Sequence, residues 1–332
     1  MSRNRGDEHT AASPLRAAQS TRPLRHTHAM VPQPPQHLQP PPQQLDIFAH
    51  SRDVMLRNDV LHALDRRDAT GARAAWRGLA DEFPTDPDLP SIDVLVRALA
   101  HSCDTPVPDH DALAAERTRL VDEVTVAAHR ALGVAAAETW LGPMWHALAR
   151  RCAALTFQAA RPDDHAAALW LRGAHWAQAA LAVQGIESWR RIPAPLAWML
   201  EARCRLDQLD ESWALVAELA WLAPGRLDAL LRRSIDPLLT RLHTAFDRRF
   251  DGAGDASDLP WFPAWVLTHT PALSPHLALA QPSQHSDAER GMRLLLDLLS
   301  LERQGRHHDL VQRRRTLRDL HAPLYAAYMA TR

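Results

Sequence analysis

Nineteen histidines give this chain its most obvious capacity for chemistry, because imidazole can bind metals and transfer protons. Their spacing does not predict a metal site. His26 and His28 lie in a proline-rich leading segment. His307 and His308 are adjacent, so on a helix their side chains point about 100° apart. No H-E-x-x-H or C-x-x-C motif accompanies them. We therefore interpret the histidines as solvated or helix-capping residues and expect no bound metal.

The other familiar chemical motifs do not occur in the sequence either. Cys103, Cys152 and Cys204 are far apart, which is typical of buried thiols in a reducing compartment. Neither a phosphate-binding glycine loop nor a G-x-S-x-G elbow is found. We expect no cofactor and no catalytic residue. The alternative is an enzyme whose active site is assembled from distant residues.

A short linear pattern, Gln44-Leu45-Asp46-Ile47-Phe48, offers a specific partner. It resembles the pentapeptide by which many bacterial replication and repair proteins attach to the sliding clamp, with Ile47 standing where leucine is commoner. That resemblance implies a tether whose apolar side chains insert into pockets of the clamp. The alternative is that Asp46 caps a first helix, and that Leu45 and Phe48 pack beneath it.

Tryptophan is unusually common, with 11 residues against six phenylalanines and two tyrosines. In alanine-rich helices most of them are expected to fill the core, because small side chains leave volume that something large must occupy. Trp261 and Trp265 lie in a stretch without helical periodicity. We expect these two to be exposed aromatics that contact a partner.

Charge and hydropathy exclude several classes of partner. The formal net charge is −1, and all 38 basic residues are arginine. The run Arg313–Arg315 lacks interleaved aromatic residues, so a solvated helix face is favoured over contact with nucleic acid. The most apolar stretch, residues 213–224, is too short to cross a bilayer and contains Glu218. No secretory signal opens the chain, so the expected location is the cytoplasm.

The elements that must position any site are predicted to be helices, giving an all-α fold. Residues 1–44 are rich in proline and glutamine and carry a net charge of +3, which predicts a disordered tail. Helical periodicity runs through residues 45–250 and returns in 287–332. Residues 251–286 are expected to be an irregular segment that serves a function or packs on something.

Local signals set some expected helix boundaries. We expect Ser91 to cap a short helix and Asp109 or Asp111 to cap a long one. Gly142-Pro143 is expected to interrupt a helix, with Pro143 beginning the next one.

Two helical hairpins repeat the same spacing of small and apolar residues. The first includes Leu56, Val60, Ala72, Trp76, Leu79 and Pro84, and the second includes Leu196, Leu200, Ser212, Val216, Leu219 and Pro224. This pattern is similar to the tetratricopeptide repeat, with Ala72 and Ser212 at the small contact positions. Asp68, or a residue close to it, and Asp207 stand where the family has its turn glycine. The resemblance implies an α-solenoid or helical array, and the alternative is a generic helical domain.

Three hypotheses for function follow. The first is a non-catalytic helical-repeat scaffold that binds a protein partner of unknown identity. The second is a replication or repair accessory protein tethered to a sliding clamp through residues 44–48. The third is an enzyme without a recognisable local motif.

Overall fold

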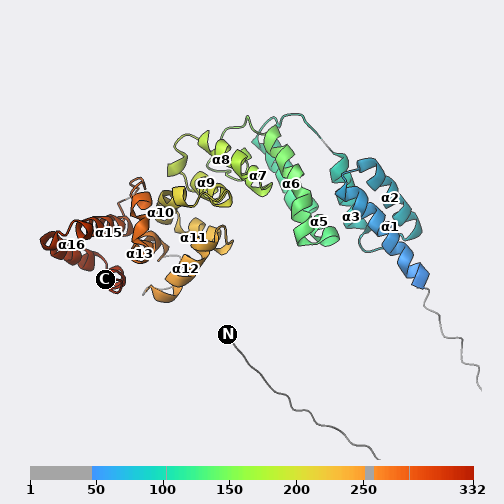
Figure 1. The fold of residues 1–332 in the computed structure, drawn as a ribbon. Helices are drawn as coiled ribbons and strands as arrows, with labels where there is room; N and C mark the ends of the chain where they lie inside the picture. Colours follow the sequence, from blue (N-terminus) through green and yellow to red (C-terminus); the bar gives the residue numbers. More distant parts are fainter. Residues whose placement is uncertain (1–46, 102, 251–257, 284) are drawn as a thin grey trace, which may run out of the picture. The chain divides into compact units, whose positions relative to one another are not determined.

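The computed structural model describes residues 47–101, 103–250, 258–283 and 285–332, with side chains described from Arg52 onward. Every regular element in these ranges is a helix, which confirms the predicted all-α fold for this part of the chain (Figure 1). The predicted tail, residues 1–44, lies outside the described residues. The helices pack as neighbours in chain order around two hydrophobic clusters, an N-terminal one and a C-terminal one.

The N-terminal cluster is built mainly from the first helices: α1 (Ile47–Asp65), α2 (Ala69–Glu82), α3 (Leu89–Ala100), α4 (His110–Arg119), α5 (Val126–Leu132) and α6 (Val134–Arg151). A π-helical stretch, Leu120–Thr125, joins α4 to α5 without a break, as the predicted long helix requires. Asp109 caps α4, since its carboxylate accepts a hydrogen bond of 2.8 Å from the Ala112 amide. The prediction for Ser91 is wrong, because α3 begins two residues earlier with Asp88 at the N-cap position.

The predicted helix break at Gly142-Pro143 is also wrong, because α6 continues through both residues. Pro143 has no amide hydrogen to donate to the Thr139 carbonyl, so the helix does lose one hydrogen bond at this position. Packing between α6 and the next helix explains why residue 142 is a glycine. A Cβ added to Gly173, at the end of α7 (Ala166–Arg172), would lie 3.3 Å from the Gly142 carbonyl oxygen. The backbones of α6 and α7 therefore approach closely at these two glycines.

Three helical hairpins share one turn geometry: α1–α2, α7–α8 (Trp176–Gln184) and α15–α16 (Asp287–Arg303 and His307–Leu320). Each turn has three residues, and the middle one is left-handed: Arg67 (φ 55°), Ala174 (φ 57°) and Gly305 (φ 68°). Its amide bonds to the carbonyl three residues earlier, and the next amide bonds five residues back. This is the Schellman pattern, which satisfies the free carbonyls at a helix end.

The left-handed residue of the first turn is therefore Arg67, one residue before Asp68. Asp207, after α9, is also left-handed (φ 57°). Ala72 and Ser212, the predicted small contact positions, are both 0% exposed.

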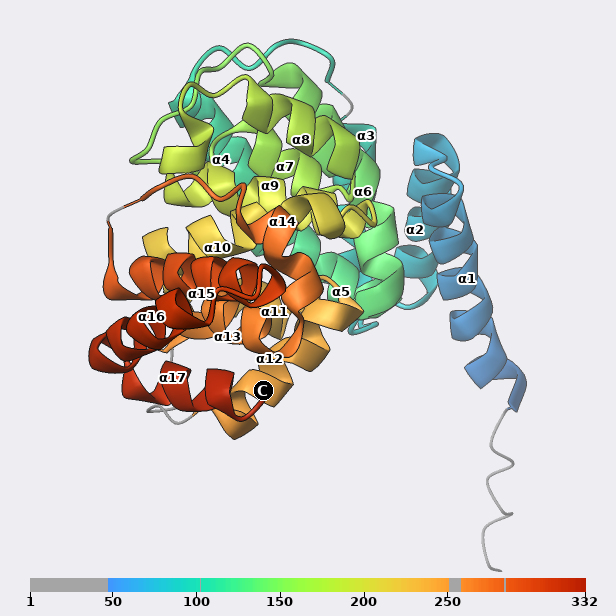
Figure 2. The same cartoon turned by 60° about the vertical axis from the view of Figure 1, so that its left-hand side comes forward.

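The C-terminal cluster is built mainly from the later helices. They are α9 (Pro193–Arg205), α10 (Trp213–Leu222), α11 (Pro224–Arg232), α12 (Pro237–Arg249), α13 (Phe262–His269), α14 (Ser274–Leu277), α15, α16 and α17 (Ala322–Met329). Figures 1 and 2 show α13 beside α15 and α17. The prediction of an irregular segment over residues 251–286 is corrected here, because α13 and α14 are helices within it. Short apolar runs between prolines hid them from the periodicity test.

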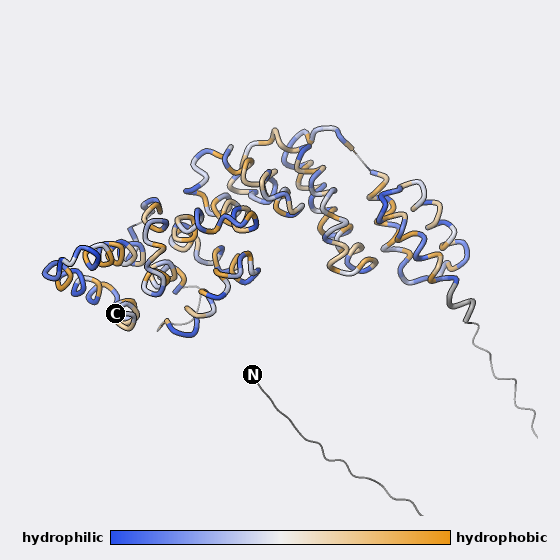
Figure 3. The backbone as a smooth tube through the Cα atoms, in the orientation of Figure 1, coloured by the Kyte–Doolittle hydropathy of each residue, from blue (hydrophilic) through white to orange (hydrophobic). Residues whose placement is uncertain are grey.

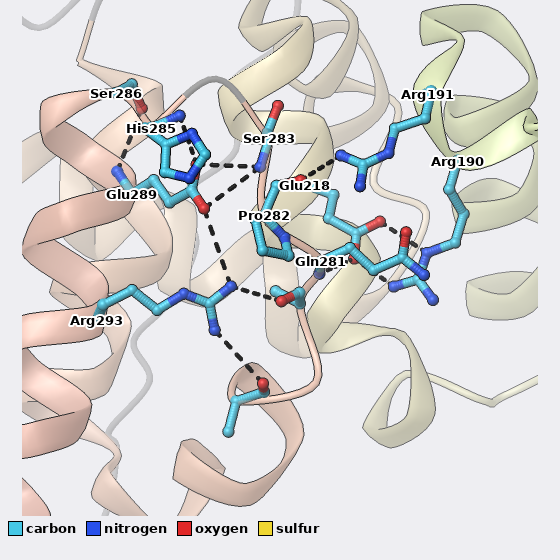
Figure 4. Close-up of polar contacts among 12 residues, drawn as sticks. Arg190, Arg191, Glu218, Gln281, Pro282, Ser283, His285, Ser286, Glu289 and Arg293 are labelled. Carbon is cyan, nitrogen blue, oxygen red and sulfur yellow. Dashed lines mark hydrogen bonds and ion pairs between the residues drawn. The ribbon is translucent and has the colours of Figure 1, made fainter.

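The segment 278–283, between α14 and α15, is held by side chains that bind its backbone (Figure 4). Glu218 of α10 accepts a hydrogen bond of 2.7 Å from the Gln281 amide. Glu289 of α15 accepts one of 3.2 Å from the Ser283 amide. Arg293, also on α15, donates to two carbonyls of the segment. Both carboxylates are 3% exposed. The amides of residues 278–280 still bond to α14, and charged side chains satisfy the amides of Gln281 and Ser283, which have no helical partner.

Hydrophobic and hydrophilic residues alternate along the helices, as the hydropathy colours in Figure 3 show. Among the described residues, no helix is both long enough and apolar enough to cross a membrane.

Candidate functional site

A hollow of about 800 Å³ lies between residues 153–157, which follow α6, and the helices α7 and α8. We call it the His165 groove. Residues 185–192, after α8, complete its wall. The lining is mostly apolar, and its apolar members are Ala153, Ala154, Leu155, Phe157, Ala166, Trp170, Leu181, Ala182, Ile186 and Ile192. A concave, largely apolar surface with few polar groups is the usual form of a binding site.

Two polar anchors fix the segments that form the groove. Arg117 of α4 donates a hydrogen bond of 2.7 Å to Asp164, whose side chain is 6% exposed, and so holds the turn before α7. His110, the first residue of α4, bonds to the Thr156 carbonyl at 2.9 Å. Both sides of the groove are thereby attached to the same helix, which makes the hollow a preformed feature of the fold.

His165 is the polar residue most deeply embedded in the groove wall. It is 7% exposed and takes the N-cap position of α7, where its Nδ1 accepts a hydrogen bond of 3.2 Å from the Ala167 amide. Its ring stacks on Trp198, with centroids 6.0 Å apart and planes 2° apart. The ring also meets Phe157 edge-on, with centroids 5.7 Å apart. Burial lowers the pKa of His165 to about 4, so the ring is neutral at neutral pH.

The cap also assigns the tautomer of this histidine. A ring nitrogen that accepts a hydrogen bond carries no proton, so in the neutral ring the proton lies on Nε2. Within the described residues, no hydrogen-bond partner is recorded for that Nε2. His165 therefore brings one donor without a partner to a wall that is otherwise mainly apolar. In the free groove water satisfies such a donor, and a carbonyl oxygen of a bound molecule can replace that water.

The rim of the groove carries an exposed apolar side chain. Leu181, on α8, lines the hollow and is 66% exposed. Single exposed leucines are ordinary on protein surfaces. Leu181 differs because it is continuous with the lining made by Trp170 and Ala182. The apolar surface therefore extends beyond the hollow itself.

The two aromatic residues predicted to be exposed, Trp261 and Trp265, have different environments in the structure. Trp265 is 1% exposed in the core, so that prediction is wrong for it. Trp261 is half-buried and stacks on His321, with ring centroids 3.8 Å apart. A Cβ added to Gly291 would lie 2.8 Å from the Trp261 ring, so this tryptophan fills space above a glycine. The apolar run around both residues is a core helix.

The predicted clamp-binding residues lie at the edge of what the structure describes. Gln44, Leu45 and Asp46 are outside the described residues. Ile47 and Phe48 begin α1, and their side chains are not described. The tether therefore stays a prediction.

Sequence reasoning missed His165, Phe157 and Trp170 as neighbours in one wall. Trp170 was recognised only as one of the tryptophans expected in the core, and it is indeed 8% exposed. The usable signal was the Asp163-Asp164-His165 turn directly before an alanine-rich helix, which is a capping pattern. Histidine is a rare cap, so the pattern was not recognised.

Buried carboxylates and groups of metal-binding side chains are the other arrangements that could carry chemistry. Glu218 and Glu289 are deeply buried carboxylates, and both accept hydrogen bonds from backbone amides of the segment 278–283. They therefore stabilise that segment. Across the described ranges, no group of three or more histidine, cysteine or acidic residues is placed to hold a metal ion.

Comparison with protein-family models, with curated proteins and with solved structures finds no match for this chain. The function is therefore argued from the groove.

Proposed function

We propose that this chain is a non-catalytic helical scaffold that binds a partner protein, and that the His165 groove receives an apolar segment of that partner. The observation that carries the proposal is the apolar hollow of about 800 Å³ with one unpartnered donor in its wall. An extended peptide supplies what such a surface needs, because its side chains fill apolar space and its carbonyls accept hydrogen bonds.

A macromolecular partner is favoured over a small ligand by the rim. A small molecule inside the hollow would cover only the face of Leu181 that lines it, whereas a peptide crossing the groove would also cover the part of the side chain that is exposed at the rim. Phe157 and Trp170 supply the large, rigid aromatic surface that commonly dominates binding energy at protein interfaces.

The test is affinity capture with variants of the groove. Wild-type protein and Leu181→Asp should be compared with Leu279→Asp, which changes a comparably exposed leucine (71% exposed) that does not line the groove. We expect partners to be captured by wild-type protein and Leu279→Asp and to be lost with Leu181→Asp, because a carboxylate cannot be desolvated against apolar surface.

A captured protein counts in favour only if it shows this dependence on Leu181. Capture that is equal for both aspartate variants would show that the groove is not the binding site. Binding of a small apolar ligand that Leu181→Asp leaves unchanged would indicate a ligand-binding protein instead.

A further inference from the structure

A second cavity, of about 380 Å³, lies among the α1–α2 turn, the end of α3 and the helices α4 and α6. We call it the Arg67 pocket. Its inner surface includes Leu99, Leu120, Met144 and Leu148, so the floor is apolar. Arg67, Arg119 and Arg151 also line it, so three basic side chains accompany the apolar ones.

The carboxylates of the pocket are already committed to arginines. Glu116 forms a two-point ion pair with Arg151, with distances of 2.5 and 2.7 Å. Asp104 lies 3.0 Å from Arg150. Arg67 and Arg119 have no ion pair with any described residue. The pocket therefore carries two positive charges without an acidic counter-ion among the described residues, and both belong to partly buried side chains.

Arg67 is held in place by the fold rather than by a counter-ion. It occupies the left-handed position of the α1–α2 turn. Its guanidinium donates to the Trp140 carbonyl and lies 5.4 Å from the centre of the Trp140 ring. The Trp140 indole donates back to the Leu64 carbonyl at 3.0 Å. Removing a guanidinium from water without a carboxylate costs free energy, which a bound anion would recover.

We propose that the Arg67 pocket binds an organic anion with an apolar body, of the class of aromatic carboxylates. Arg67 and Arg119 would bind the carboxylate, and the leucine and methionine floor would cover the ring. This site and its ligand are independent of the His165 groove. An inorganic anion would use the charges and leave the floor in contact with water.

Cys103, which lines the pocket, provides a built-in reporter. It is exposed, whereas Cys152 and Cys204 are 0% and 2% exposed, so only Cys103 reacts readily in the native protein. Dithiobis(nitrobenzoate) is an aromatic disulfide with two carboxylates, and dithiodipyridine is a neutral aromatic disulfide. The Cys103 thiolate attacks one sulfur, the old S–S bond breaks, and the aryl thiolate leaves with the electron pair and absorbs light.

The rate constant for the anionic reagent is divided by that for the neutral reagent, which cancels the intrinsic reactivity of the thiol. We expect this ratio to fall about tenfold in Arg67→Gln and in Arg119→Gln, equivalent to about 1.4 kcal/mol each. Arg66→Gln, which changes an exposed arginine of the same turn, should keep the wild-type ratio. Cys103→Ser gives the background.

Competition distinguishes the proposed ligand from a simple charged patch. Nitrobenzoate should slow the reaction of Cys103 with the anionic reagent, and nitrobenzamide should not. Equal ratios in Arg66→Gln and Arg67→Gln would overturn the proposal. So would inorganic phosphate that competes as well as nitrobenzoate does. Arg119→Gln keeps the test valid if Arg67→Gln fails to fold, because Arg119 makes no recorded contact with Trp140.

Discussion

In the described part of the chain, two histidines use their side chains to cap helices, at N-cap positions that serine, threonine, aspartate or asparagine usually fill. His165 accepts from the Ala167 amide at the start of α7, and His321 accepts from the Leu324 amide at the start of α17. Each ring packs against a tryptophan, Trp198 for His165 and Trp261 for His321. Burial lowers the pKa of both rings. A cap that must be neutral to accept a hydrogen bond makes these helix ends sensitive to acid.

The free energy of unfolding should therefore depend on pH through the protonation of His165. Its pKa is about 4 in the folded chain, against 6.5 for an ordinary histidine. Between these values the unfolded chain binds a proton and the folded chain does not. The free energy of unfolding should thus decrease as pH falls from about 6.5 to about 4, by roughly 3 kcal/mol in all. Urea unfolding at several pH values measures the change.

The control for this prediction is a cap that does not titrate. His165→Asn retains an acceptor for the Ala167 amide, so its stability should change less over the same pH range than that of wild-type protein. His308→Asn, at an exposed position of α16, should follow the wild-type curve. Parallel curves for His165→Asn and wild-type protein would contradict the role given to His165.

At the scale of elements, one turn geometry joins three hairpins, although only Gly305 among its left-handed residues is a glycine. A residue with a Cβ is strained in this conformation by about 1–2 kcal/mol. Replacing exposed Ala174 with glycine should therefore stabilise the protein by roughly 0.5–1 kcal/mol, despite the greater freedom of glycine in the unfolded chain. Thermal or urea unfolding measures this.

The matched substitution is Ala74→Gly, at an exposed position inside α2. There the backbone is helical, so glycine should destabilise by about 1 kcal/mol. The two changes are chemically identical and should have opposite signs. Destabilisation by both would show that the turn at Ala174 is not strained.

The helices themselves could largely be predicted from sequence, because apolar spacing and caps such as Asp109 act locally. Two failures came from contacts between distant residues. The α6 helix continues past Pro143, and its backbone packs closely against Gly173 at Gly142. The helix α13 was missed because its apolar residues are buried on every side and show no helical period. The His165 groove was also unpredictable, since its wall joins Phe157, Trp170 and Leu181 through tertiary packing.

At the scale of the whole molecule, α7 belongs to both hydrophobic clusters. Ala166 and Leu169 pack in the N-terminal cluster, and Ala167 and Ala168 pack in the C-terminal one. The His165 groove lies at this shared helix, because His165 caps it and Trp170 is part of it. A partner bound in the groove would therefore contact the element that connects the two cores.

The proposed tether, residues 44–48, lies at the start of the first helix. An extended peptide is the form that inserts into pockets of a partner, yet Ile47 and Phe48 already belong to α1. Attachment to a sliding clamp through Gln44–Phe48 would therefore require the first turn of α1 to unwind. A free peptide spanning Pro40 to Arg52 avoids that cost, since so short a segment is not helical in isolation.

We therefore expect this peptide to bind a sliding clamp at micromolar concentrations, and to bind at least as tightly as the full chain. Replacing Leu45 and Phe48 together with alanine should abolish binding of both and leave the melting temperature unchanged, because a tether contributes nothing to the core. If the two side chains instead pack beneath α1, the double substitution should lower the melting temperature by several degrees, and the peptide should not bind. Calorimetry of binding and thermal unfolding of the same variants separate the two outcomes. Loss of stability without peptide binding would end the clamp hypothesis.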